Sequence, residues 1–210
     1  MNRVKVYVDG FNFYFGLRSK GWRKYYWLDL NALSTALMKP DQTLAGVHYF
    51  TSRIRNTGDN VPDMQRQSLY LEALGTLSDV QLHFGHYLQK NRRCFECGAK
   101  WKNYEEKMTD VNIAVQLLAD AYDNSFDTAL LISADSDLTT PVRKLLAQFP
   151  DKRVIVVFPP DRRSADLAKA ATATFLINET ALRQSQLPAE VQRADGFILQ
   201  RPAYWQQHPT

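Results

Sequence analysis

The sequence has few of the features that mark secreted or membrane proteins. It contains only two cysteines among 210 residues, too few for a domain held together by disulfides. No apolar run approaches the roughly 20 residues that a membrane-spanning helix needs. The N-terminus leads directly into a strand pattern, so we expect no secretory signal. These absences predict a cytoplasmic protein that does not bind membranes.

Common nucleotide-binding motifs are also missing. No Gly-x-Gly-x-x-Gly follows the first predicted strand, which argues against a standard dinucleotide site. No Walker lysine loop, internal repeat or low-complexity segment is present. With 45% hydrophobic and 12% aromatic residues, the chain can bury the core of one domain.

The charge balance is mildly basic. The formal net charge is +4, and positive residues stand beside aromatic rings between residues 18 and 27. We interpret Arg18, Arg23 and Lys24 as candidate substrate-binding residues, because single-stranded nucleic acid pairs its phosphates with cations and stacks its bases on rings. A solvated basic face beside a buried aromatic core is the alternative explanation.

Short apolar strands alternate with helical patterns along most of the chain. The predicted strands cover 4–8, 46–53, 80–88, 128–132, 153–158 and 174–177. The predicted helices cover 12–17, 30–38, 62–77, 111–122, 138–148, 164–170 and 179–184. This alternation predicts an α/β fold with a doubly wound, mostly parallel sheet and helices on both faces, in three α/β/α layers.

The same patterns predict how the domain is organised. One domain covers residues 1–184. An irregular, polar loop insertion at about 89–107 contains both cysteines. Residues 185–210 are polar and contain proline, which predicts a C-terminal tail.

Four aspartates stand where such a fold gathers its functional groups. Asp9 follows the first predicted strand, and Asp135 and Asp137 follow a later one. Acidic residues just past parallel strands share one crevice near the point where the strand order reverses. Asp110 opens a helix pattern, where the helix dipole favours an ionised carboxylate. We predict that these four residues are catalytic and bind Mg²⁺ or Mn²⁺, which prefer oxygen ligands.

Each aspartate also has an ordinary explanation as a helix N-cap or a turn residue. In addition, Asp135-Ser-Asp137-Leu-Thr139 matches the Asp-x-Asp-x-Thr pattern of haloacid-dehalogenase-type phosphatases, in which the first aspartate is a nucleophile. That motif normally follows an early strand, whereas here it comes late in the chain.

Three polar residues near the aspartates are further candidates for substrate binding. Asn12 comes three residues after Asp9 and suits a hydrogen bond to a carboxylate or phosphate, or a helix cap. Ser133 ends the same apolar strand as the acidic pair. Lys107 precedes Asp110 by three residues, so it suits balancing the acidic cluster or holding a phosphate.

Three segments of the chain stand in a characteristic order and spacing. They are Val-Tyr-Val-Asp9-Gly10-Phe-Asn12, then Glu-Glu-Lys107-Met-Thr-Asp110-Val-Asn-Ile-Ala, then Ser133-Ala-Asp135-Ser-Asp137-Leu followed by Arg-Val-Ile-Val-Val-Phe. Over about residues 3–180 the chain thus resembles the NYN domain family, which is PIN-like and related in fold to flap-endonuclease domains. The resemblance implies a metal-dependent ribonuclease fold with the four aspartates at the metal-binding positions.

Two positions depart from the family pattern. Ala134 stands where glycine is usual before the acidic pair, and Met108-Thr109 replaces the common Gly-Val. Neither departure removes a ligand. The resemblance supports the fold more firmly than the activity, because function depends on the site.

The segment Cys94-Phe-Glu-Cys97-Gly98 has the spacing of half a zinc knuckle, although zinc normally takes four ligands. His83 and His86 lie upstream, but residues three apart on a strand point to opposite faces and do not easily share an ion. Zinc bound with one histidine or with a partner subunit's cysteines, a metal-free turn and a redox-active pair stay open.

The sequence therefore predicts a metal-dependent endoribonuclease that hydrolyses single-stranded or structured RNA, with a homo-oligomer left open. One alternative is a non-catalytic RNA- or nucleotide-binding module on the same fold. Another is an interaction module that assembles through the tail or the cysteine loop.

Overall fold

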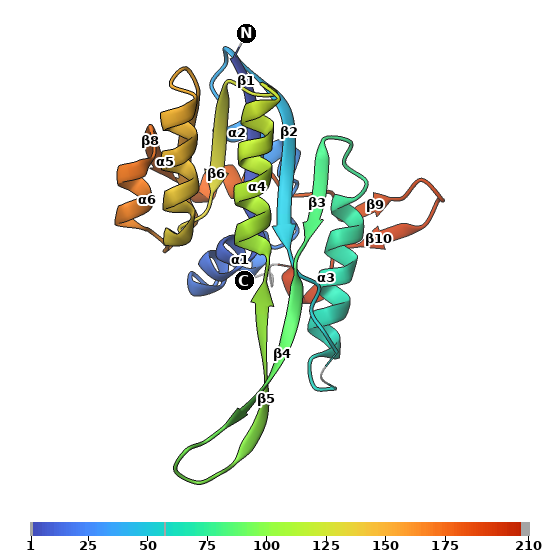
Figure 1. Ribbon diagram of the computed structural model, residues 1–210. Coiled ribbons are helices and arrows are strands. Elements are labelled where there is room, and N and C mark those ends of the chain that lie inside the picture. Colours follow the sequence, from blue (N-terminus) through green and yellow to red (C-terminus); the bar gives the residue numbers. More distant parts are fainter. Residues whose placement is uncertain (1, 57, 207–210) are drawn as a thin grey trace.

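The computed structural model describes residues 2–56 and 58–206, except for the side chains of 87–91 and 101–107. Its centre is a six-stranded sheet with the order β3-β2-β1-β6-β7-β8, in which every pairing is parallel (Figure 1). The strands are β1 (Asn2–Asp9), β2 (Gln42–Thr51), β3 (Val80–Phe84), β6 (Thr128–Ile132), β7 (Arg153–Phe158) and β8 (Ala173–Leu176). The predicted doubly wound α/β fold is confirmed.

The strand order reverses between β1 and β6, the two central strands. Every residue of β6 is buried, which explains its continuous apolar run, since a parallel strand covered on both faces has no polar side. The loops that leave the carboxyl ends of β1 and β6 therefore meet at the topological switch point of the sheet.

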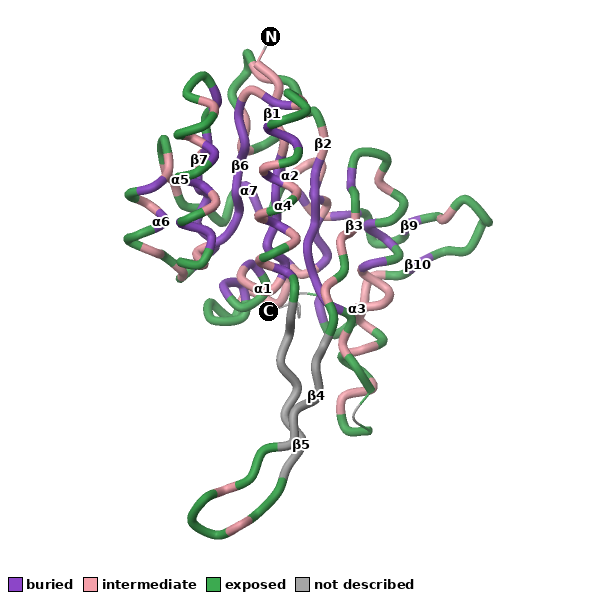
Figure 2. The backbone as a smooth tube through the Cα atoms, viewed as in Figure 1, coloured by how far each residue is buried: buried purple, intermediate pink, exposed green. Residues whose placement is uncertain are grey.

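Helices cover both faces of the sheet, as β1 illustrates. Val4, Val6 and Val8 pack into one core, whereas Tyr7 packs into the other, because successive side chains of a strand point to opposite faces. Strand β6 is buried along its whole length between the helices of the two faces (Figure 2). The helices of the first core are α1 (Gly10–Ser19), α2 (Leu30–Leu37), α3 (Val61–Leu74) and α7 (Glu179–Gln184). Those of the second are α4 (Thr109–Tyr122), α5 (Thr139–Gln148) and α6 (Ala165–Ala170).

The cysteine segment is a hairpin, which corrects the predicted irregular loop. Strands β4 (His86–Arg93) and β5 (Lys100–Lys107) pair in antiparallel register and form an arm that extends away from the sheet (Figure 1). The polar composition of this segment gives no hydrophobic period, so its sequence predicts a loop. Backbone hydrogen bonds instead pair the strands over their whole length.

The predicted polar tail is also corrected, over residues 185–206. This segment forms β9 (Glu190–Gln192), β10 (Ile198–Gln200) and the short helix η3 (Ala203–Trp205). It packs because a few widely spaced apolar side chains enter a small core with Trp27 and Ala73. Those side chains are Leu187, Val191, Leu199 and Trp205.

Two further short helices lie at the loops that matter for the site. They are η1 (Arg23–Tyr25), after α1, and η2 (Ser136–Leu138), between β6 and α5. Among the helices that the structure describes, none combines the length and hydrophobicity that crossing a bilayer requires.

Candidate metal centre

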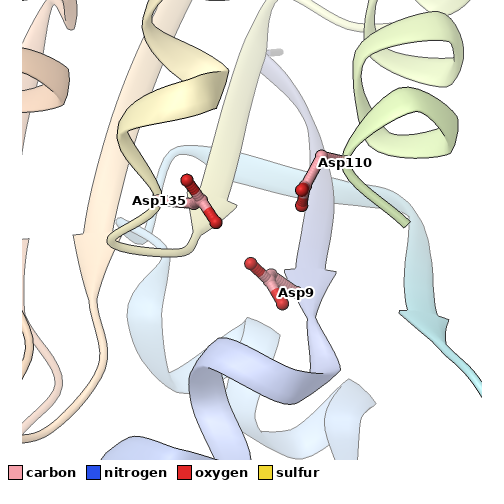
Figure 3. Close-up of side chains that lie close together, drawn as sticks. All are labelled: Asp9, Asp110 and Asp135. Atoms are coloured by element: carbon pink, nitrogen blue, oxygen red, sulfur yellow. The ribbon is translucent and has the colours of Figure 1, made fainter. Parts of the chain in front are cut away.

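Three carboxylates meet at the switch point of the sheet. Asp9 ends β1, Asp135 follows β6, and Asp110 lies in the first turn of α4. One oxygen from each of the three lies within 4.8 Å of the others, and the side chains face a common space (Figure 3). The sequence correctly places these residues at one edge of the sheet, and the structure brings them close enough to share an ion.

Asp9 is the buried member of the group, with 3% of its surface exposed. It also caps α1, because its Oδ1 accepts a hydrogen bond of 2.9 Å from the backbone N–H of Asn12. Its Oδ2 accepts a hydrogen bond of 2.8 Å from the hydroxyl of Ser133. Asp9 can therefore cap α1 and bind a metal ion at the same time, since each of its oxygens keeps a second lone pair for a ligand.

Ser133 and Asn12 position the loop after β6. The Ser133 hydroxyl accepts the N–H of Asp135 at 3.0 Å, and the Asn12 carboxamide oxygen accepts the N–H of Ala134 at 3.2 Å. Ser133 thus links the end of β1 to the loop after β6, and Asn12 links α1 to the same loop. These hydrogen bonds lie within the protein, so the role of Ser133 and Asn12 in substrate binding stays a prediction.

Asp110 is positioned by an unusual start of α4. Met108, just before the helix, has φ of 80°, the left-handed region in which glycine is favoured. This is one of the two positions at which the chain departs from the family pattern of glycine. Methionine at this position keeps the left-handed backbone conformation at a cost of about 1–2 kcal/mol relative to glycine. The first turn of α4 then presents Asp110 to Asp9 and Asp135.

The electrostatics of the three carboxylates favour a bound cation. Burial, with the charges of Asp110 and Asp135, raises the pKa of Asp9 to about 6 even though its hydrogen bonds act in the opposite direction. Burial and the charge of Asp135 also raise the pKa of Asp110. Among the described side chains, no lysine or arginine forms an ion pair with any of the three. An all-carboxylate donor set in this state fits Mg²⁺ or Mn²⁺.

Asp137 stands apart from this group. Its side chain is exposed, and it is not one of the residues whose oxygens lie within 4.8 Å of one another. Its backbone N–H donates to Asp135 Oδ1 at 2.9 Å, so the short helix η2 holds the Asp135 carboxylate in place. The charge of Asp137 nevertheless contributes to the raised pKa of Asp110.

Comparison with known proteins agrees with this geometry. The family model described as "NYN domain" matches residues 3–199, nearly the whole chain. The chain belongs to the NYN domain family. The PIN-like nuclease fold that the resemblance implies is thereby confirmed, and the match extends past residue 184 into the packed C-terminal segment.

This NYN domain is similar to one named protein in sequence and to one solved structure in fold. The 6-hydroxy-3-succinoylpyridine 3-monooxygenase HspA of Pseudomonas putida is 30% identical over an alignment of 249 positions, gaps included, which covers 99% of this chain and 76% of the relative. The crystal structure of a protein of unknown function from Vibrio parahaemolyticus matches with a TM-score of 0.57 at 20% identity, over 89% of this chain and 96% of that one. The second likeness concerns the fold alone.

The basic residues of the 18–27 segment separate into two groups in this NYN domain. Arg18 and Arg23 line a cavity of about 740 Å³ beside α1. Lys24 instead pairs with Glu179 at 3.2 Å and is not among the residues that line it. The side chain of Lys107, the remaining predicted substrate contact, lies outside the described residues.

Several residues of this cavity are absent from the sequence predictions. Arg66 comes from α3, and Tyr204 and Trp205 come from η3. Tyr204 and Trp205 reach the cavity because the C-terminal segment packs against the body of the domain. No local motif signals that arrangement, although the aromatic residues near the C-terminus are unusual for a solvated tail.

The two cysteines lie at the tip of the hairpin. The Cys94 N–H donates to Ala99 O at 2.8 Å, and the Gly98 N–H donates to Cys94 O at 3.0 Å, which forms a tight turn with Gly98 at φ of 72°. His83 is occupied elsewhere, since its Nε2 lies 2.9 Å from His48 Nδ1 and its ring stacks on Phe50. Both thiols are free.

Proposed function

We propose that this NYN domain is a metal-dependent ribonuclease that hydrolyses phosphodiester bonds of RNA. The observation that carries the proposal is the convergence of Asp9, Asp110 and Asp135 at the switch point of a PIN-like nuclease fold. Family membership supports a hydrolase of the nuclease type, and RNA is the substrate that it implies.

Each residue has a role in this proposal. Asp9, Asp110 and Asp135 would hold Mg²⁺ or Mn²⁺, and Asp137 would contribute through water or a second ion. A divalent ion bound there activates water and stabilises the charge that develops on the phosphodiester.

The neighbouring residues orient the carboxylates and attract the substrate. Ser133 and Asn12 fix the carboxylates through the hydrogen bonds described above. Lys107 precedes the cluster on β5 and holds a phosphate in this proposal. Arg18, Arg23 and Lys24 provide positive charge for the RNA backbone beside α1.

The hairpin tip is a second candidate site within the same function. Cys94 and Cys97 supply two thiols on one turn, and four-coordinate zinc requires two further ligands. His83 is engaged with His48, and His86 lies opposite Lys107 at the far end of the hairpin from the cysteines. A second copy of the hairpin is therefore the source that fits, and a homo-oligomer follows if zinc binds.

The relative from Pseudomonas putida favours a second candidate reaction. That protein is named a monooxygenase of a hydroxypyridine, and the alignment covers nearly all of this chain. A monooxygenase on this fold would use the same crevice for another reaction. RNA binding without cleavage is the third possibility that an experiment has to distinguish.

The test is RNA cleavage with Mn²⁺ or Mg²⁺ by the wild-type chain, Asp9→Asn and Asp135→Asn. Asp151→Asn is the matched control, because Asp151 is exposed just before β7, at the opposite edge of the sheet from the metal group. We expect cleavage by the wild type and the control, and a loss of about 100-fold or more in both site variants.

Two outcomes would overturn the proposal. If Asp9→Asn and Asp135→Asn cleave like the wild type, these carboxylates do not carry the reaction. If the wild type binds several RNAs tightly and yields no metal-dependent products, the domain is a binding module.

A further inference from the structure

The cavity beside α1 is a second candidate site of the domain, and the proposed metal chemistry does not account for it. It lies between α1, η1, the first half of α3 and the C-terminal segment. Gly10, which directly follows Asp9, lines it, as does Thr51 at the end of β2. The cavity therefore reaches the junction of β1 and α1, one residue after Asp9 in the chain, and extends from there along α1.

Aromatic rings form much of its wall. Tyr26 packs edge-on against Trp205 with ring centroids 5.7 Å apart, and Tyr70 does the same at 6.1 Å. Tyr14, which is 40% exposed, contacts Tyr26 at 5.1 Å. Flat apolar faces that are partly open to solvent suit a planar ring as ligand.

Three arginines also line the cavity. The guanidinium groups of Arg23 and Arg66 lie over the ring of Tyr204, at 3.8 Å and 4.5 Å from its centroid. Arg18 lines the same space from α1. Stacking on an aromatic face leaves the N–H groups at the edge of a guanidinium available for an anion.

The charge of the lining is positive. Asp63 is the one acidic residue among the described residues that line the cavity, and it pairs with Arg66. Three arginines against one aspartate leave two positive charges in excess. Such a wall favours a ligand that carries a phosphate or a carboxylate.

The volume of about 740 Å³ lies within the range of cavities that bind small molecules or cofactors. We propose that this cavity binds a planar aromatic ring that bears an anionic group. In the ribonuclease proposed above, the ring is an RNA base and the anion is its phosphate. The identification of the ring as an RNA base rests on the proposed function, whereas the binding of an anionic aromatic ring does not.

The test is calorimetric titration of the full chain in EDTA, with adenosine and uridine 5′-monophosphates in one arm and 4-hydroxybenzoate in the other. The variants are Arg66→Gln and Tyr204→Ala. Tyr204 is 54% exposed, so its removal leaves the core intact, and thermal melting checks the fold of each variant. Arg143→Gln, on the exposed side of α5, is the matched control.

We expect binding by the wild type and the control, and affinity lower by roughly tenfold or more in both variants. Binding of the nucleotides supports RNA as the source, and binding of 4-hydroxybenzoate alone supports a small aromatic acid. If neither probe binds, or if the variants bind like the wild type, the cavity is not this site. Because EDTA removes the metal, a failure to bind is distinguishable from a failure to cleave RNA.

Discussion

Replacing Asp9 by asparagine should make the metal-free protein more stable at neutral pH, although Asp9 is one of the three proposed metal ligands. Burial, with the charges of Asp110 and Asp135, raises the pKa of Asp9 from 3.8 to about 6. An acid whose pKa is higher in the folded state contributes stability that is complete below pH 3.8 and is lost as the pH rises through 6. Above pH 6, the ionised carboxylate therefore lowers the free energy of unfolding.

The size of the effect follows from the shift. About two pH units correspond to about 3 kcal/mol at pH 7.5. Asparagine removes this cost but disturbs the hydrogen bond from Ser133, which offsets about 1–2 kcal/mol. The net gain is about 1–2 kcal/mol, or roughly 2–8 °C in Tm for a chain of this size.

The assay is thermal melting in EDTA between pH 4 and pH 8, followed by melting at pH 7.5 with Mn²⁺. The Tm of the wild type should fall toward pH 8 more steeply than that of Asp9→Asn. Mn²⁺ at about 100 times its Kd should restore about 2.7 kcal/mol to the wild type and much less to the variant. A variant that melts below the wild type in EDTA at pH 7.5, with no response of the wild type to Mn²⁺, would refute the reasoning.

Three further predictions concern the rest of the molecule. Asp120→Ala should lower the free energy of unfolding by about 3–5 kcal/mol in chemical denaturation, because the buried Asp120 of α4 accepts hydrogen bonds from Lys5 and Tyr7 of β1. Exposed Asp123→Ala is the control, and equal losses would contradict this account. Leu199→Ala should cost about 2–5 kcal/mol, since Leu199 is fully buried in the C-terminal core, and an unchanged midpoint would mean that the segment does not pack. If the hairpin tip binds zinc, elemental analysis of protein purified without chelator finds zinc that Cys97→Ser removes; a zinc-free wild type excludes a zinc site at the hairpin tip.

The sheet and the carboxylate group could be predicted because both follow from local patterns. Buried parallel strands such as β6 are apolar throughout, and the residue that follows such a strand lies at the functional edge of the sheet. Asp9 and Asp135 satisfy this rule directly. Asp137 does not join them, because two residues further on the chain has already turned into η2.

The hairpin, the C-terminal packing and the cavity could not be predicted in this way. The hairpin is held by backbone pairing, which leaves no hydrophobic period in a polar sequence. The C-terminal segment is held by four apolar side chains whose partners, Trp27 and Ala73, lie more than a hundred residues away in the sequence. The cavity is formed by the same long-range packing, so Arg66 and Tyr204 carry no local signal of their position.

The most direct test of the central claim is anomalous diffraction from crystals of the full chain soaked in Mn²⁺. The account predicts an anomalous peak bonded by carboxylate oxygens of Asp9, Asp110 and Asp135, and its loss in Asp9→Asn. A saturating soak that gives no peak among these three residues, or a peak that persists in the variant, would contradict it.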